Sequence, residues 1–115
     1  MEDYKSGPLA TRKAASKKAT DKFPSKIPII CQKSTSSVLP SLAKSKFLIP
    51  KSLEVLEFER LIRKRISLDE REAIFFLING KIMPRKDSTM EQVYEKEKDE
   101  DGFLYVIYTE ENFIG

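Results

Sequence analysis

The chain has 115 residues, 40% of them hydrophobic and 34% charged, which suits one globular domain with a highly charged surface. Its longest apolar runs, Ala73–Ile78 and Phe103–Tyr108, have six residues each, whereas a membrane-spanning helix needs about 20, so we expect no transmembrane segment. The absence of histidine excludes Ser/His and Cys/His nucleophiles and most zinc sites. We expect no cofactor.

Three helices and five strands are predicted after an irregular segment over residues 1–10. In chain order they are a helix over Thr11–Lys22, strands over Lys26–Gln32 and Lys46–Ile49, a helix over Leu53–Arg65, strands over Ala73–Ile78 and Lys81–Met83, a helix from Ser88–Glu91 to about Lys96, and a strand over Phe103–Thr109. This order is typical of an α+β fold in which helices cover one face of a sheet.

The first half of this pattern raises two structural questions. The Thr11–Lys22 segment favours a helix by propensity, but its only apolar residues are alanines, so it needs a neighbour on which to dock. Pro28 lacks a backbone donor, so we expect a free edge beside the first strand or an interruption of its hydrogen bonds at that point.

The second half contains stronger local signals. Ser52 is expected to cap the central helix, and Ser88–Glu91 has the pattern of a capping box. Ala73–Ile78 is continuously apolar, which predicts a central strand covered on both faces, and Asn79-Gly80 predicts a tight hairpin after it. Three- and four-residue spacing predicts the core stripe of the central helix, which consists of Val55, Phe58, Ile62 and Ile66.

The net charge of +3 conceals two halves of opposite sign. Residues 1–66 carry 15 Lys/Arg and 6 Asp/Glu, and residues 67–115 carry 6 and 12, which gives +9 and −6. This division indicates two faces with different partners, although solvated surfaces would produce the same pattern. The only cysteine, Cys31, cannot form an internal disulfide, so we expect a reducing compartment and a buried thiol that acts as a small hydrophobe.

Several segments resemble the ubiquitin-like modifiers of autophagy, the family that includes the GABA-receptor-associated protein. They are Lys26–Lys33, Lys46–Pro50, Ile62–Ile66, Asp101–Val106, and Tyr108 together with Glu111-Asn112. The resemblance implies an α+β, ubiquitin-like β-grasp fold with an N-terminal helical extension. It divides the chain into the extension (1–22), the β-grasp domain (23–109) and a flexible tail (110–115).

The resemblance also implies a covalent role for the terminal glycine. In this family that glycine, here Gly115, passes through an activating and a conjugating enzyme and is joined to the amine of phosphatidylethanolamine. A residue without Cβ suits a narrow enzyme channel and an exposed carbonyl. A cysteine protease processes and deconjugates such proteins, and Ile114 departs from the aromatic residue usual at that position. The alternative is that Gly115 is only the end of the chain.

A second implied activity is the binding of aromatic-x-x-aliphatic peptides with acidic flanks, by pairing with the strand edge at Lys46–Ile49. The implied aromatic pocket consists of Pro28, Ile30, Lys46, Leu48 and Phe103. The implied aliphatic pocket consists of Phe47, Ile49, Pro50, Leu53, Phe58 and Leu61, of which Leu53, Phe58 and Leu61 could equally be core. The cations expected to meet the acidic flanks are Lys26, Lys44, Lys46 and Arg65.

Ala15 and Ala19 depart from this family pattern, which commonly has an acidic and a larger aliphatic residue at the matching positions. We therefore expect a wider aromatic pocket that prefers phenylalanine or tyrosine to tryptophan. The basic residues of segment 12–22 are interpreted as a solvated helix face, with contact to an anionic membrane as the alternative.

These observations lead to one principal hypothesis and two alternatives. The principal hypothesis is a non-enzymatic autophagy modifier that is cytoplasmic when free and attached to the autophagosome membrane when lipid-conjugated. One alternative is a β-grasp adaptor that binds peptides without conjugation. The other is a small nucleic-acid-binding domain, which the basic half alone suggests. We expect no nucleic-acid partner, because aromatic residues do not interleave with the basic ones.

Overall fold

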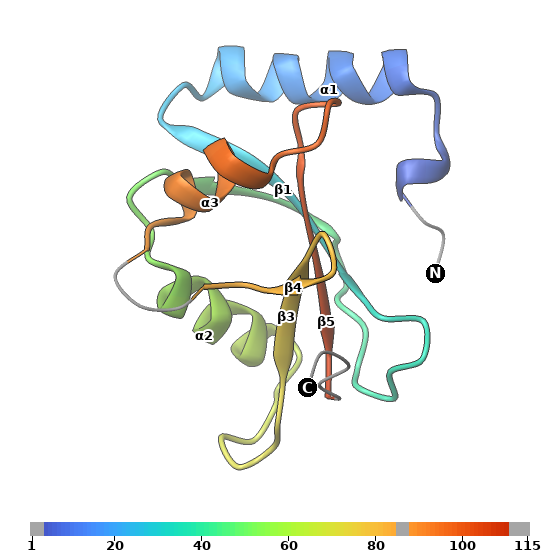
Figure 1. Cartoon of the computed structure of the whole chain (residues 1–115), viewed down its shortest axis with the longest axis vertical. Coiled ribbons are helices and arrows are strands. Elements are labelled where there is room, and N and C mark those ends of the chain that lie inside the picture. Colours follow the sequence, from blue (N-terminus) through green and yellow to red (C-terminus); the bar gives the residue numbers. More distant parts are fainter. Residues whose placement is uncertain (1–3, 85–87, 111–115) are drawn as a thin grey trace.

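The computed structural model describes residues 4–84 and 88–110. Its elements, in chain order, are a 3-10 turn over Tyr4–Ser6, α1 (Leu9–Lys22), β1 (Lys26–Lys33), β2 (Lys46–Pro50), α2 (Val55–Arg65), β3 (Phe75–Ile78), β4 (Lys81–Ile82), α3 (Met90–Glu97) and β5 (Leu104–Thr109) (Figure 1). All three helices and five strands predicted from the sequence are therefore present. No helix in the described part of the chain has the length and apolar character needed to span a membrane.

The strands form one mixed sheet in the order β2-β1-β5-β3-β4. β1 and β5 are parallel, and the other neighbouring pairs are antiparallel. The first and last strands of the chain, β1 and β5, are therefore neighbours in the interior of the sheet. β2 forms one edge and β4 forms the other.

The main core lies between the sheet and two of the helices, α2 and α3. The predicted stripe of α2 is confirmed, since Val55, Phe58 and Ile62 are fully buried and Ile66 is 4% exposed. Burying such a side chain contributes roughly 1.5–3 kcal/mol. Cys31 is buried in the same core, as expected, and this burial raises the pKa of its thiol.

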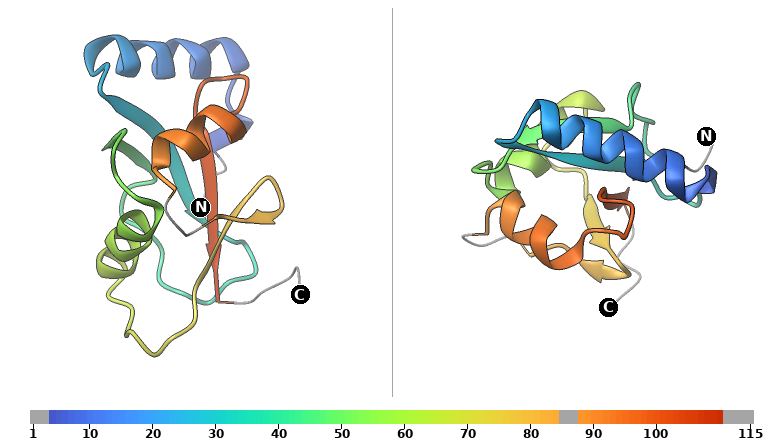
Figure 2. Two further views of the ribbon diagram at one scale, coloured as in Figure 1. Left: turned by 60° about the vertical axis from the view of Figure 1, so that its left-hand side comes forward. Right: turned by 90° about the horizontal axis from the view of Figure 1, so that it is seen from above.

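The helix α1 lies against β1 on the other face of the sheet (Figure 2). Side chains alternate along a strand, and in β1 the residues Ile27 and Ile29 belong to the main core. Pro28, between them, instead borders a cavity that α1 also lines. The expectation that all helices share one face is therefore wrong for α1.

Pro28, which lacks a backbone N–H donor, lies at a position of β1 where no strand partner needs that donor. Cys31 donates its backbone N–H to the carbonyl of Ser45 at 2.8 Å, so alternate residues of β1 point their backbone groups at β2. By this alternation the nitrogen of Pro28 faces the β5 side, where strand pairing begins only at Ile29. On this side Pro28 precedes the paired stretch and lies on an unpaired edge of β1, which is one of the two outcomes predicted.

Two predicted helix starts are displaced along the chain. Ser52 does not cap α2, because Leu53 accepts a bond from the Met90 N–H at 2.7 Å and the neighbouring Glu54 bridges to Thr89. These pairings delay the helix until Val55, and Glu54 becomes its N-cap through a reciprocal box with Glu57. The box at α3 lies one residue later than predicted and joins Thr89 to Gln92.

The prediction that β3 is covered on both faces is wrong. Phe76 and Ile78 are buried, whereas Phe75 and Leu77 are only half-buried, because α2 and α3 cover one face alone. The hairpin after β3 is confirmed: Asn79 and Gly80 have φ values of 51° and 75°, which a two-residue turn of this kind requires.

Candidate peptide-binding site

A cavity of about 280 Å³ opens between α1 and the β1–β2 edge of the sheet. The residues that line it are Ala15, Ala19, Pro28, Lys46, Phe47, Leu48 and Phe103. Four of the five residues predicted for an aromatic pocket are among them. The fifth, Ile30, is 1% exposed and lies beneath the surface rather than at the cavity wall.

Strand register explains why these residues meet. Pro28 is paired with Leu48, and Ile30 is paired with Lys46, so two cross-strand pairs share the face that α1 covers. Phe103, directly before β5, is 3% exposed and completes the apolar floor. Residues from four separate elements thus form one concave apolar surface with an ammonium group at its margin.

The β2 strand leaves its outer edge open in the described part of the structure. Since Cys31 bonds to Ser45, the alternation places the backbone groups of Phe47 toward β1 and those of Lys46 and Leu48 outward. An extended peptide can therefore add to this edge by pairing with Lys46 and Leu48. The cavity lies directly beside these two residues.

The residues predicted for an aliphatic pocket fall into two groups. Ile49 and Phe58 are buried core residues, at 3% and 0% exposure. The remaining members lie nearer the surface: Phe47, Leu53 and Leu61 are half-buried and Pro50 is exposed. The rings of Phe47 and Phe58 are 6.5 Å apart and nearly perpendicular, so the two groups are in contact between β2 and α2.

The predicted cations surround this region at several points. Lys46 Nζ lies 4.9 Å from the centroid of the Tyr4 ring, and the Arg65 guanidinium lies 5.9 Å from that of Phe47. Lys26 Nζ lies 5.6 Å from the Phe23 ring, and Lys44 is exposed. The strand edge is therefore flanked by positive charge, as an acidic peptide would require.

A polar cluster fixes α1 over the sheet and so sets one wall of the cavity. Arg12 Nη1 lies 2.7 Å from Asp101 Oδ2, and the side chain of Asp101 is fully buried. Ser16, which is 5% exposed, donates its hydroxyl to the carbonyl of Asp101. Tyr105 donates its hydroxyl to the same carboxylate. The pKa of Tyr105 is raised mainly by burial and in addition by this hydrogen bond.

Two contributors to this arrangement were not predicted from the sequence. Tyr4 lies in the segment expected to be irregular, yet its ring packs edge-on against Phe103 with centroids 5.3 Å apart. Asp101 was given no role of its own from the sequence, but it accepts bonds from Arg12, Tyr105 and the backbone of Phe103. Neither role follows from periodicity, because both depend on residues distant in sequence.

The terminal residue Gly115, predicted as the conjugation site, lies outside the described residues. The structure describes the chain up to Glu110, just beyond β5. There the Glu110 carboxylate accepts a hydrogen bond of 2.9 Å from the backbone N–H of Val38. The root of the predicted tail is thus bonded to the loop between β1 and β2.

Comparisons with known proteins agree with this geometry. The family model described as autophagy protein Atg8, ubiquitin-like, matches residues 11–115. The autophagy-related protein 8 of Candida glabrata is 45% identical, and that of Saccharomyces cerevisiae is 43% identical, each over 108 residues. These matches cover 94% of this chain and 91% and 92% of the relatives.

A solved structure supports the same relationship. The crystal structure of Trypanosoma brucei ATG8 matches with a TM-score of 0.85 and 35% identity, over 94% of this chain and 95% of that one. The predicted ubiquitin-like α+β fold with an N-terminal helical segment is therefore confirmed.

Proposed function

Because the chain belongs to the Atg8 family of autophagy-related ubiquitin-like proteins, we propose that it acts as a lipid-conjugated modifier and not as a catalyst. In this proposal Gly115 is joined to phosphatidylethanolamine, and the folded domain recruits receptors or cargo with aromatic-x-x-aliphatic motifs. The free protein is cytoplasmic and the conjugate lies on the autophagosome membrane. The observation that carries the receptor role is the apolar cavity beside the open edge of β2.

Receptor binding uses the edge and its two flanking apolar regions. The peptide backbone pairs with Lys46 and Leu48, and residues one and four of the motif, three positions apart in an extended strand, then point to opposite faces of the sheet edge. The aromatic side chain enters the cavity beside Phe103, and the aliphatic one packs near Phe47 and Leu53. Acidic residues before the motif meet Lys46 and its neighbouring cations.

The expected affinity follows from these contacts. Two buried anchors contribute about 1.5–3 kcal/mol each, and each added backbone bond contributes about 1 kcal/mol net. Ordering the peptide opposes much of this, so we expect dissociation constants in the micromolar range. Many copies attached to one membrane raise the effective affinity through avidity.

Conjugation proceeds by acyl transfer through the terminal carboxylate. ATP converts the Gly115 carboxylate to an acyl adenylate with release of pyrophosphate, and a thiolate of the activating enzyme displaces AMP. The acyl group passes to a thiolate of the conjugating enzyme. The amine of phosphatidylethanolamine then attacks this thioester, which forms an amide and releases the thiol. A cysteine protease of the pathway processes the precursor and hydrolyses the amide.

The test compares the native chain with Gly115→Ala in starved cells of the source organism. We expect the native chain to give a faster-migrating, membrane-bound band that phospholipase removes, and Gly115→Ala to give none. If neither chain gives the band while autophagy is active, the conjugation proposal is rejected. The favoured function then becomes a peptide-binding adaptor without conjugation. The cavity between α1 and the β1–β2 edge, called below the groove beside α1, supports that function by itself.

A further inference from the structure

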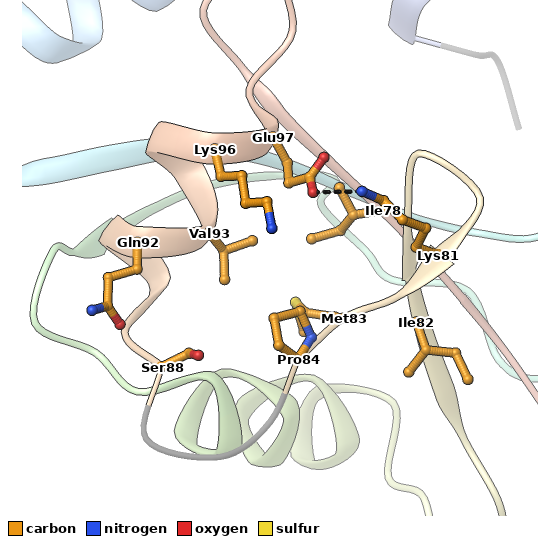
Figure 3. Close-up of a pocket in the computed structure, with 10 residues that line it drawn as sticks. All are labelled: Ile78, Lys81, Ile82, Met83, Pro84, Ser88, Gln92, Val93, Lys96 and Glu97. Atoms are coloured by element: carbon orange, nitrogen blue, oxygen red, sulfur yellow. Dashed lines mark hydrogen bonds and ion pairs between the residues drawn. The ribbon is translucent and has the colours of Figure 1, made fainter.

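A second pocket lies at the opposite edge of the sheet, between α3 and the segment that follows the hairpin (Figure 3). Its volume is about 430 Å³. The buried side chains of Ile78, Met83 and Val93 form its floor, at 3%, 1% and 4% exposure. Ile82, which is 41% exposed, borders it on the β4 side. The pocket is therefore an apolar depression that reaches the surface.

The charged side chains at the mouth of this pocket differ in whether they have partners. Both carboxylate oxygens of Glu97 are already bonded, one to Asn79 Nδ2 at 3.0 Å and the other to Lys81 Nζ at 3.0 Å. Lys96 is exposed, and Figure 3 shows its amine directed over the pocket beside Val93. Lys96 forms no ion pair with any residue that the structure describes, although it lies in the field of Glu97.

The neighbouring strand offers an open backbone edge. The Met83 N–H donates to the Phe76 carbonyl at 2.8 Å, and Ile78 is paired with Lys81. In an antiparallel pair the residue between these two positions turns its N–H and C=O away from the partner strand. That residue is Ile82, so one donor and one acceptor face outward at the pocket.

We propose that this pocket binds an extended peptide segment with an aliphatic side chain and an Asp or Glu within two residues of it. The aliphatic side chain contacts Ile78, Met83 and Val93, the carboxylate pairs with Lys96, and the peptide backbone pairs with Ile82. The outward donor and acceptor of Ile82 match a peptide backbone and the ammonium of Lys96 matches a carboxylate, whereas anionic membranes and nucleic acids offer no extended peptide backbone to pair with a strand edge.

This second site is independent of the groove beside α1. β2 and β4 are opposite edges of the five-stranded sheet, and the two pockets share no lining residue. A single molecule can therefore hold two peptides at once. The inference does not depend on conjugation through Gly115, so its failure would leave the proposed function untouched.

The test selects short random peptides from a phage-displayed library against the full chain, with the groove beside α1 blocked by saturating aromatic-x-x-aliphatic peptide. We expect selected peptides to share an aliphatic residue next to Asp or Glu. Their binding to the native chain is then measured by fluorescence polarisation against Lys96→Glu and Val93→Lys. A matched control is Lys98→Glu, since Lys98 is exposed and only two residues from Lys96 in sequence but does not line the pocket.

The proposal predicts that Lys96→Glu lowers the affinity for the selected peptides about tenfold or more, corresponding to about 1.4 kcal/mol of binding free energy, and that Lys98→Glu changes this affinity little. Because Lys96 is exposed, this variant is expected to fold normally, which a thermal melt verifies. Equal binding by Lys96→Glu and the native chain would overturn the proposal. So would failure to select any peptide, or binding of phosphatidylserine vesicles that Lys96→Glu abolishes without any effect on peptides.

Discussion

Ala15 shows how a single side chain can set the preference of the candidate receptor groove. It lines the 280 Å³ cavity from α1, together with Ala19, and neither methyl group accepts a hydrogen bond. Both residues depart from the family pattern, and the structure places them at the cavity wall. The α1 side of the pocket is consequently apolar.

We therefore predict that Ala15→Glu will shift peptide preference toward tryptophan. A carboxylate at this position can accept the indole N–H, and one such bond contributes about 1 kcal/mol, or roughly a fivefold change in affinity. The measurement is the ratio of dissociation constants for tryptophan and phenylalanine peptides. Ala14→Glu is the matched control, because Ala14 is exposed and does not line the cavity. Equal affinity of Ala15→Glu for the two peptides would contradict the prediction.

Glu110 provides a pH-dependent contact at the root of the tail. Hydrogen bonds from Ser37 and from the backbone of Val38 lower the pKa of its carboxyl group to about 2. A carboxyl group with a lowered folded-state pKa stabilises the fold above its unfolded pKa, and this stabilisation is lost as the pH falls through the folded value.

For Glu110→Gln we expect a lower melting temperature than that of the native chain at neutral pH. The difference should shrink as the pH falls from the ordinary glutamate range toward 2, because protonation then removes the charged acceptor from the native chain. Thermal unfolding of both chains across this pH range measures the difference in melting temperature. Glu70→Gln serves as control, since Glu70 is exposed in a loop. A melting-temperature difference that stays constant with pH would show that the carboxylate charge is not responsible.

Among the elements, α1 depends most on contacts distant in sequence. It buries only Ser16, so its docking rests on the bonds of Ser16 and Arg12 to Asp101 and on close approach to the turn before β5. Gly102 makes this approach possible. It has a φ of +90°, and a Cβ at this position would overlap the Ser16 hydroxyl.

Gly102→Ala is therefore predicted to loosen α1 as well as to strain the turn. Gly80→Ala is a matched control, since Gly80 also has positive φ, at +75°, but a Cβ there meets no atom within 4 Å. Backbone strain of this kind costs on the order of 1–3 kcal/mol in both variants. We expect Gly102→Ala to lose more stability than Gly80→Ala and to show faster hydrogen exchange in α1. Equal exchange in the two variants would refute the role assigned to Gly102.

At the scale of the whole molecule, ion pairs join the two oppositely charged halves of the chain. Lys5 pairs with Asp99 at 2.8 Å, Arg12 pairs with Asp101, and Lys51 lies 3.9 Å from Glu91. Part of the excess positive charge is thereby neutralised at the α1 side. The cations that remain near the edge of β2 include Lys26, Lys44 and Lys46.

The affinity for acidic-flanked motif peptides should therefore decrease as salt is added. An exposed ion pair contributes about 0.2–1 kcal/mol, so screening each pair should weaken binding by up to about fivefold. Titrations at low and high salt, with the same peptide flanked by serine as control, measure this contribution. If the two peptides show the same salt response, the flanking cations make no contact with the peptide.

The sequence by itself determined the elements, the stripe of α2, the hairpin at Asn79-Gly80 and, through family resemblance, most of the cavity wall. These features depend on neighbouring residues, whose spacing and turn chemistry are local. Only the tertiary structure decided that α1 covers the face opposite α2, that β3 is open on one side and that Lys96 lies over a second pocket. These features arise from strand order and from pairs such as Arg12 and Asp101, which no local pattern brings together. The delayed start of α2 has the same cause, because the bond from Met90 to Leu53 outweighs the capping preference of Ser52.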